Sequence, residues 1–165
     1  MMKKWINAHW RDARRHSVAG LCLLLLSTSA VLAADHPTVA APSTNAQAQV
    51  MRAVRQYGEL LIELRFESTA DTFGGETIYE NMTPDIMNSS FYIEAQGQHF
   101  TLSDTGKAQL PTSLRLNFSY DRNKNPRVGA WRGRFVAPPT SITQVELHIP
   151  GLALISGISI TDRGE

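Results

Sequence analysis

The sequence predicts an all-β domain of antiparallel strands, and three observations carry this prediction. From residue 57 onward apolar residues recur at every second position, turn-forming Gly, Pro and Asn residues separate these runs at short intervals, and no helical pattern long enough for a crossover connection lies between them. The chain has 165 residues, of which 42% are hydrophobic and 19% charged, a composition typical of a folded domain. An antiparallel sandwich or barrel follows.

The first 33 residues have the features of a secretory signal peptide. Five basic residues precede an apolar run over residues 18–26, and small residues follow it, with Val31 and Ala33 at the two positions that a signal peptidase inspects. The apolar run is far shorter than the ~20 residues that a membrane-spanning helix needs. We therefore expect cleavage near Ala33/Ala34, a periplasmic or secreted protein, and no membrane span after cleavage.

Two other export signals can be weighed within this segment. Cys22 is the residue type that carries lipid in bacterial lipoproteins, but Leu21 stands before it, where a small residue is required. Arg14-Arg15 is the pair used for export of folded proteins, but the bulky apolar residues that usually follow such a pair are missing. We therefore expect ordinary export in the unfolded state.

Removal of residues 1–33 changes the chemistry of the chain. This segment holds five basic residues and one acidic residue, so the remaining 132 residues carry a net charge of −3 instead of the +1 of the whole chain. The only cysteine, Cys22, also leaves with the segment. We therefore expect no disulfide, thiol nucleophile or thiolate metal ligand in the mature protein.

The mature chain is expected to begin with a flexible leader over residues 34–49. Ala, Pro, Ser, Thr, Gln and Asn dominate this stretch, and few large apolar side chains are available for burial. Residues 50–56 are expected to form a short helix that ends before Gly58. The remaining length suits one β-domain over residues 50–165 with a single core.

The strongest strand signal lies between Leu60 and Phe66. Four apolar residues at even positions alternate there with mostly charged residues, which predicts one buried side and one side in water. Residues 91–95 and 100–102 predict a hairpin closed by Gln96-Gly97. Further strands are expected over residues 77–80, 114–120, 128–136, 142–149 and 152–161, with a loop over residues 121–126. About seven to eight short strands at this spacing favour an immunoglobulin-like sandwich over a barrel.

Four short segments follow one another in a recognisable order. They are Phe91-Tyr92-Ile93-Glu94, residues 96–102, residues 131–138 and residues 145–149. Their succession resembles bacterial secreted immunoglobulin-like domains of uncharacterised function, over roughly residues 58–161. The resemblance implies a β-sandwich and export. It implies no catalytic residue, because the shared pattern contains none.

Sequence motifs of catalysis are missing. No serine lies in a glycine-flanked turn of the kind that presents a hydrolase nucleophile. Glu59, Glu63 and Glu67 fall on the outward side of one strand, where a solvated face is the simplest interpretation. Gly74-Gly75 lacks the lysine and further glycines of a phosphate-binding loop and predicts a turn or bulge. We expect neither enzymatic activity nor a cofactor.

A metal site is a weaker alternative. His99 and His148 are the histidines of the mature domain apart from His36 in the leader. Three methionines offer soft thioether ligands for copper: Met51, Met82 and Met87. His-x-Met, His-x-His and His-x-x-x-His spacings are missing, and both histidines fall on the polar side of a strand, where a surface role is the simpler interpretation.

Charge is unevenly distributed along the chain. Residues 107–134 carry a net charge of +6, whereas residues 34–106 carry −7. The candidate binding surface is a basic patch beside an indole, formed by Arg122, Lys124, Arg127, Trp131, Arg132 and Arg134. In an exported protein such a patch suits an acidic protein surface or an anionic envelope polymer rather than nucleic acid. Two alternatives to this patch stay open. Acidic and basic strands that are neighbours in a sheet would neutralise its charge, and Trp131 would be a core residue instead of an exposed one.

These observations favour a binding protein over an enzyme. We expect an exported, non-catalytic accessory protein of the bacterial envelope that acts through protein–protein interaction, as an adaptor or an inhibitor. The first alternative is a binder of anionic envelope polymer that uses the basic segment 122–134. The second is a periplasmic copper carrier that uses His99 and His148.

Overall fold

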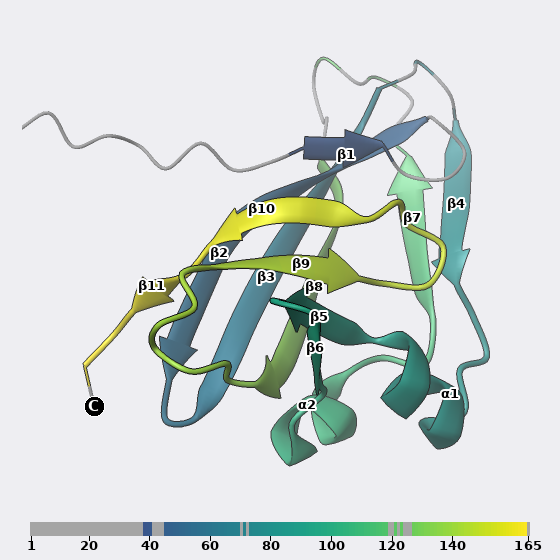
Figure 1. Ribbon diagram of the computed structural model, residues 1–165. Helices are drawn as coiled ribbons and strands as arrows, with labels where there is room; N and C mark the ends of the chain where they lie inside the picture. Colours follow the sequence, from purple (N-terminus) through teal and green to yellow (C-terminus); the bar gives the residue numbers. More distant parts are fainter. Residues whose placement is uncertain are drawn as a thin grey trace, which may run out of the picture. The chain divides into compact units, whose positions relative to one another are not determined.

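The computed structural model describes residues 38–40, 45–69, 71, 73–118, 121, 123 and 127–164 (Figure 1). Several sequence predictions lie outside these residues: the signal peptide over residues 1–33, residues 34–37 and 41–44 of the predicted leader, and the loop residues Arg122 and Lys124. The described part of the chain is mostly β-structure, as the sequence predicts.

Eleven strands and two short helices follow one another along the described residues. The strands are β1 (Thr38–Ala40), β2 (Ala46–Gln56), β3 (Glu59–Ser68), β4 (Gly74–Tyr79), β5 (Tyr92–Ala95), β6 (Gln98–Thr101), β7 (Leu114–Phe118), β8 (Arg127–Val136), β9 (Gln144–His148), β10 (Ile155–Ser159) and β11 (Thr161–Asp162). The helices are α1 (Pro84–Ser90) and α2 (Asp104–Gln109). The pairing of β11 with β2 is parallel and the other strand pairings are antiparallel.

Five strands form the first sheet, in the order β1-β2-β3-β8, with β11 also paired to β2. A long hairpin of β2 and β3 is its centre, and Tyr57 and Gly58 turn the chain with φ angles of 52° and 74°. Two residues in the left-handed region give a hairpin turn the same twist as its strands. Parallel pairing places Thr161 of β11 beside Val54 of β2, which brings the end of the described chain back to this hairpin.

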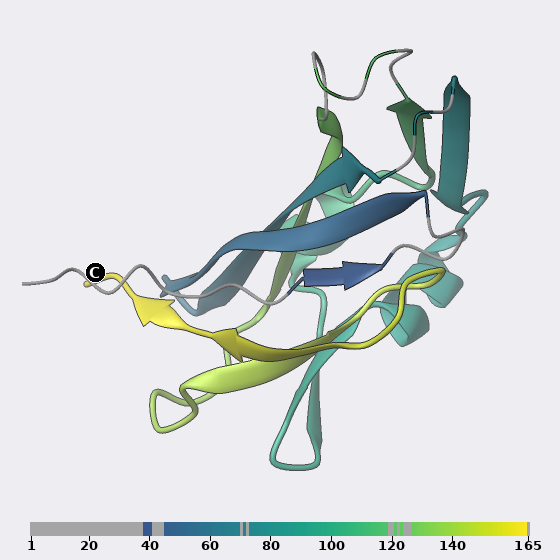
Figure 2. The same ribbon diagram turned by 90° about the horizontal axis from the view of Figure 1, so that it is seen from above.

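Four strands form the second sheet, in the order β10-β9-β5-β6. The predicted hairpin is confirmed here: Gln96 and Gly97 join β5 to β6 with φ angles of 52° and 74°. A third sheet contains β4 and β7 alone. Seen from above, the first and second sheets form two separate layers (Figure 2).

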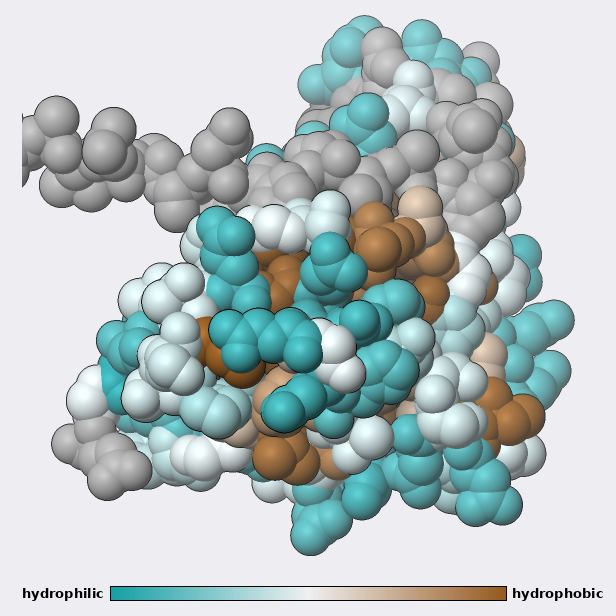
Figure 3. Space-filling view, viewed as in Figure 1, coloured by the Kyte–Doolittle hydropathy of each residue, from teal (hydrophilic) through white to brown (hydrophobic). Residues whose placement is uncertain are grey.

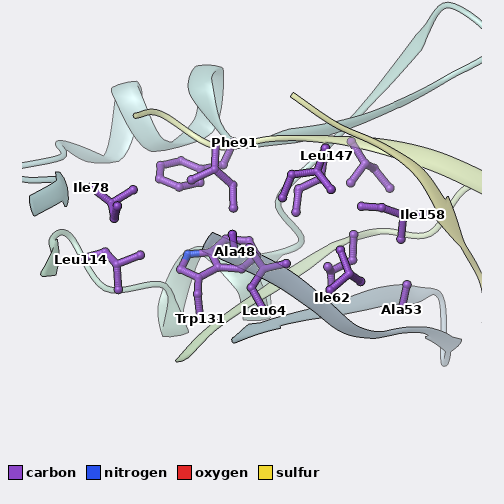
Figure 4. Packing of buried hydrophobic residues seen from close by; sticks show 14 of the residues in the cluster. Ala48, Ala53, Ile62, Leu64, Ile78, Phe91, Leu114, Trp131, Leu147 and Ile158 are labelled. Carbon is purple, nitrogen blue, oxygen red and sulfur yellow. The ribbon is translucent and has the colours of Figure 1, made fainter. Parts of the chain in front are cut away.

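The inward faces of the two larger sheets share one hydrophobic core. Phe91 and Leu147 from one layer point toward Ile62 and Leu64 from the other (Figure 4). The four apolar positions between Leu60 and Phe66 that were predicted to face inward are at most 2% exposed, so this prediction is confirmed. Their burial fixes the register of β3, because a slip by one residue would move the whole apolar set into water.

Trp131 fills the core, which is one of the two alternatives that the sequence left open. The residue is 2% exposed, and its indole Nε1 donates a hydrogen bond to Tyr79 Oη at 3.1 Å. The ring of Phe91 stacks on the indole with a centroid distance of 6.5 Å. Burial raises the pKa of Tyr79 to about 12, against the opposing effect of the hydrogen bond from Trp131.

Alkaline pH is expected to destabilise the protein through Tyr79. Its pKa in the folded state is raised above its unfolded value, so the stabilising contribution is complete below the unfolded pKa of about 10 and is lost as the pH rises through about 12. Thermal unfolding across this range should show a steep fall in Tm that is weaker in Tyr79→Phe. The exposed Tyr57→Phe variant should keep the wild-type slope, and a wild-type slope in Tyr79→Phe would contradict the prediction.

The end of the predicted leader belongs to the folded domain. Residues 46–49 form the start of β2, where Ala46 and Ala48 are completely buried. The prediction of a flexible segment is therefore wrong for this stretch. That prediction rested on the lack of large apolar residues in the stretch. In the structure, hydrogen-bonded pairing with β3 and burial of the alanine methyl groups offset the entropy lost when the segment becomes ordered.

The predicted helix over residues 50–56 is also wrong, because these residues continue β2. A β-bulge between Val50 and Arg52 explains the error. The extra residue moves the inward side from Val50 to Ala53, while Val54 on the other face of the sheet is also buried. The buried residues therefore acquire the i, i+3, i+4 spacing of an amphipathic helix.

Two short helices are missing from the predicted elements. Helix α1 follows Thr83, whose Oγ1 accepts a hydrogen bond from the backbone N–H of Ile86 at 3.4 Å, and Pro84 occupies its first turn. Helix α2 follows Ser103, whose Oγ accepts from Gly106 N at 3.0 Å. Thr-Pro-Asp and Ser-Asp are helix-start signals that could have been read from the sequence. Within the described residues, the helices are too short to span a bilayer.

Candidate metal centre

The outward face of the four-stranded sheet carries a cluster of titratable and aromatic side chains. Tyr92 and Glu94 come from β5, His99 from β6, and Glu146 and His148 from β9. The intervening residues of β5 and β9 are buried in the core, so the members of this His–Glu cluster project to the other side. In the sheet register Glu94 stands opposite both His99 and Glu146, and Tyr92 stands opposite His148.

Tyr92 is sandwiched between the two imidazole rings. Its ring centroid lies 4.3 Å from that of His99 and 4.2 Å from that of His148, with interplanar angles of 23° and 17°. Because β5 lies between β6 and β9, the two imidazoles flank Tyr92 on opposite sides. Stacking of this kind restrains the orientation of both histidines.

Glu94 places its carboxylate between the same two histidines. Its Oε2 atom lies 3.2 Å from His99 Nε2 and 3.7 Å from His148 Nε2. The longer separation exceeds hydrogen-bond distance. The Nε2 atom of His148 is buried, and it has no hydrogen-bond partner among the described residues. A buried imidazole nitrogen is therefore left unsatisfied next to a carboxylate.

Three members of the cluster are arranged to share one ion. Glu94, Glu146 and His148 each offer one ligand atom, and these atoms lie within 4.8 Å of one another. The ligand atoms of a tetrahedral metal ion with bonds of about 2.1 Å stand roughly 3.4 Å apart. The observed limit of 4.8 Å exceeds this spacing by about 1.4 Å, so the three atoms would have to approach one another when an ion binds.

His99 has a different place in the cluster. It lies on the far side of Tyr92 and is not part of the three-residue group. Its Nε2 contacts the Glu94 carboxylate, which is the kind of contact that orients a metal ligand from outside the coordination shell. The sequence nominated His99 and His148 as equals, whereas the geometry makes His148 a candidate ligand and His99 a positioning residue.

An open hollow of about 320 Å³ adjoins the two carboxylates. It is lined by residues of β5 and the turn after it, of β9 and of β10: Glu94, Ala95, Gln96, Gln144, Val145, Glu146 and Gly157. Figure 3 shows hydrophilic residues spread over this side of the molecule, with hydrophobic residues between them. Such an opening gives water or a ligand access to a fourth coordination position.

No family model, curated protein or solved structure matches this chain. The resemblance to secreted immunoglobulin-like domains therefore stays a prediction. Evidence for function comes from the geometry of the chain's own residues.

The methionines suggested as copper ligands do not join the cluster. Met51 is on β2 of the other sheet, Met87 is buried in the core, and Met82 packs against that core. The chain positions two carboxylates near His148 instead, and neither Glu94 nor Glu146 was nominated from the sequence. Each is two residues from an aromatic or histidine on the same strand, and this i, i+2 spacing on the polar side of a strand is the signal that could have found them.

The predicted basic residues are only partly brought together. Arg132 Nε lies 2.7 Å from Glu63 Oε1, and Arg134 Nη1 lies 3.1 Å from Glu59 Oε2. Both contacts follow from the antiparallel pairing of β8 with β3. Acidic and basic strands therefore neutralise each other at these positions, as one of the sequence alternatives anticipated.

Two other members of the predicted patch, Arg127 and Trp131, line one pocket of about 230 Å³ together with Arg132. Arg127 is exposed at the start of β8, whereas Trp131 faces the core from the opposite side of the strand. Arg122 and Lys124 are outside the described residues. An exposed indole beside two guanidinium groups does not form within the described part of the chain.

Proposed function

We propose that this protein is an exported, non-catalytic binding protein whose ligand is a divalent transition-metal ion held by Glu94, Glu146 and His148. One observation carries the proposal: the Nε2 atom of His148 is buried without a hydrogen-bond partner beside a carboxylate oxygen. Buried polar atoms normally have a partner. A metal ion between the imidazole and the carboxylates would supply that partner and neutralise two negative charges.

The ligand set indicates the class of metal. One imidazole and two carboxylates form a nitrogen–oxygen shell, which suits Zn²⁺, Ni²⁺ or Cu²⁺ better than Cu⁺, because Cu⁺ prefers sulfur ligands. Tyr92 stacks on the His148 ring and His99 contacts Glu94, so two ligands already have a neighbour that restrains them. The proposed site differs from that of the copper carrier considered from the sequence, because carboxylates rather than methionines accompany the histidine.

The proposed location and fold class agree with this function. The predicted signal peptide over residues 1–33 supports a periplasmic or secreted protein of the bacterial envelope. Two mainly antiparallel sheets around one shared core support an immunoglobulin-like sandwich, to which β4 and β7 add a small third sheet. Action through another envelope protein, as an adaptor or inhibitor, stays a prediction of the sequence.

Zinc titration of the purified protein tests the proposal. Isothermal calorimetry should give one site, and His148→Ala should weaken binding by at least about 100-fold, or roughly 2.7 kcal/mol, because the only nitrogen ligand is lost. Glu146→Gln should weaken binding as well. Zinc at about 100 times the Kd of the wild type should add roughly 2.7 kcal/mol to the free energy of unfolding of the wild type. The same zinc concentration should stabilise the His148→Ala variant much less.

His99→Ala is the matched control for this titration. It removes a histidine from the same face of the same sheet but no proposed ligand, so we expect a loss of about tenfold, typical of residues that orient a ligand. An equal loss in His99→Ala and His148→Ala would contradict the assigned ligands. A wild-type protein that does not bind Zn²⁺, Ni²⁺ or Cu²⁺ would overturn the proposed function.

A further inference from the structure

A second concave site lies on the five-stranded sheet, away from the His–Glu cluster. It is a pocket of about 180 Å³ beside the turn between β2 and β3. Its lining residues come from that hairpin, from β8 and from the segment after β11: Arg52, Val54, Gln56, Tyr57, Glu59, Leu61, Arg134 and Arg163. This arginine pocket joins residues that are more than 100 positions apart in the sequence, because β11 runs parallel to β2.

Positive charge dominates the arginine pocket. Arg52, Arg134 and Arg163 line it together with one carboxylate, that of Glu59, which gives a formal net charge of +2 among the lining residues, or +1 when Glu63, the partner of Arg52, is included. Arg134 contacts Glu59 at 3.1 Å, and Arg52 contacts Glu63 at 2.7 Å. Burial alone would raise the pKa of Glu59, but hydrogen bonds with Ser103, Thr105 and Arg134 outweigh burial and hold that pKa below its usual value.

Arg163 is the member of the pocket without a partner for its guanidinium. Its backbone N–H donates to the carbonyl oxygen of Arg55 at 3.1 Å, so the main chain is fixed to β2. Within the part of the chain that the structure describes, its exposed side chain makes no ion pair or hydrogen bond. A guanidinium with five unused donors therefore stands at the rim of the pocket.

Tyr57 and two apolar residues complete the arginine pocket. Tyr57 is 73% exposed at the hairpin turn, which presents its ring and hydroxyl to solvent. Val54 and Leu61 are opposite each other in the β2–β3 register and form an apolar floor between the charged groups. The site thus combines a cationic rim with a small apolar base and an aromatic side.

We propose that the arginine pocket binds a phosphate group. The planar guanidinium fork donates paired hydrogen bonds to phosphate oxygens, and the unpartnered Arg163 together with the excess of positive charge at the pocket suits a phosphate that carries about −1.5 to −2 near pH 7. Free phosphate and the phosphate of a lipid headgroup share this chemistry. The proposal does not depend on the metal site, because no residue is common to both.

Binding of inorganic phosphate and of phosphatidic acid vesicles tests the proposal. The full-length protein is titrated in EDTA, which keeps the His–Glu cluster free of metal, with phosphatidylcholine vesicles as the reference surface. Arg163→Gln should weaken binding at least about tenfold at constant ionic strength, while its Tm stays at the wild-type value because the side chain has no partner to lose. Binding of inorganic phosphate would assign a small ion, and binding of the vesicles alone would assign a headgroup.

Arg127→Gln is the matched control. It removes an exposed arginine of the same sheet that does not line the pocket, so phosphate binding should stay within about twofold of the wild type. Equal weakening by Arg127→Gln and Arg163→Gln would show a general charge effect and overturn the site. Failure of the wild type to bind either probe would overturn it as well, without consequence for the zinc titration.

Discussion

Arg55→Met is expected to lower the free energy of unfolding by about 2–4 kcal/mol. Arg55 is 7% exposed, yet its guanidinium is fully engaged. It donates to both carboxylate oxygens of Asp162 and to four carbonyl oxygens after β8: Pro138, Pro139, Thr140 and Ile142. A methionine fills much of the volume but removes the donor from the buried contacts with the carbonyl oxygens of Pro138 and Ile142, and buried acceptors without partners are costly.

Equilibrium unfolding in urea measures this loss through the midpoint and slope of the transition. Arg55→Lys should be intermediate, because one ammonium keeps the charge but cannot reach acceptors spread around a planar fork. Arg127→Met, an exposed arginine of β8, should change the free energy of unfolding by less than about 0.5 kcal/mol. A loss below about 1 kcal/mol in Arg55→Met would contradict the prediction, because it would show that water donates hydrogen bonds to the carbonyl oxygens in place of the guanidinium.

Acid unfolding provides a second test of the same contact. The hydrogen bond from Arg55 lowers the pKa of the Asp162 carboxyl. A carboxyl whose folded pKa is depressed stabilises the protein above its unfolded pKa of about 3.9, and this contribution is lost as the pH falls through the lowered folded value. The acid branch of the stability curve should therefore be shallower in Arg55→Met than in the wild type.

Strand positions could be predicted wherever one continuous alternation of apolar and polar residues covered a whole strand. The alternation from Leu60 to Phe66 and the Gln96-Gly97 turn follow local rules, and both predictions are confirmed. Prediction failed where a bulge interrupts the alternation, as at Val50 and Arg52 in β2. A bulge changes the phase of the alternation within a strand, so the local spacing of apolar residues resembles that of a helix.

The candidate metal centre could be predicted only in part. His99 and His148 were nominated as residue types, but their partners depend on which strands are neighbours in the sheet. Glu94 meets His148 because β5 pairs with β9 across about 50 residues of sequence. Motif spacing reveals sites built on one helix or one loop, whereas this cluster is assembled by strand register.

Strand pairing also determines which of the unevenly distributed charges are neutralised. The basic block over residues 107–134 meets the acidic block when β8 pairs with β3, so Arg132 and Arg134 acquire glutamate partners. Within the arginine pocket, the guanidinium without a partner among the described residues belongs to Arg163, which the sequence did not nominate. It reaches the arginine pocket through the parallel pairing of β11 with β2, a contact that no local pattern indicates.

Trp131→Ala is expected to lower the free energy of unfolding by about 3–5 kcal/mol. The change empties the space of a buried indole and leaves Tyr79 Oη without its donor. Gly133 follows on the same inward side of β8, and a Cβ at this position would collide with the indole of Trp131 and lie 2.9 Å from Phe135 Cε2. Gly133→Ala alone should therefore cost about 1–3 kcal/mol through overpacking.

The double variant separates this packing argument from a general weakness of β8. When Trp131 is already alanine, the main obstacle to a methyl group at Gly133 is gone, and the methyl group fills part of the cavity. Urea unfolding should show that the double variant loses at least about 1 kcal/mol less than the two single variants added together. Additive losses would mean that Gly133 is required for the backbone of β8 rather than for the space that the indole occupies.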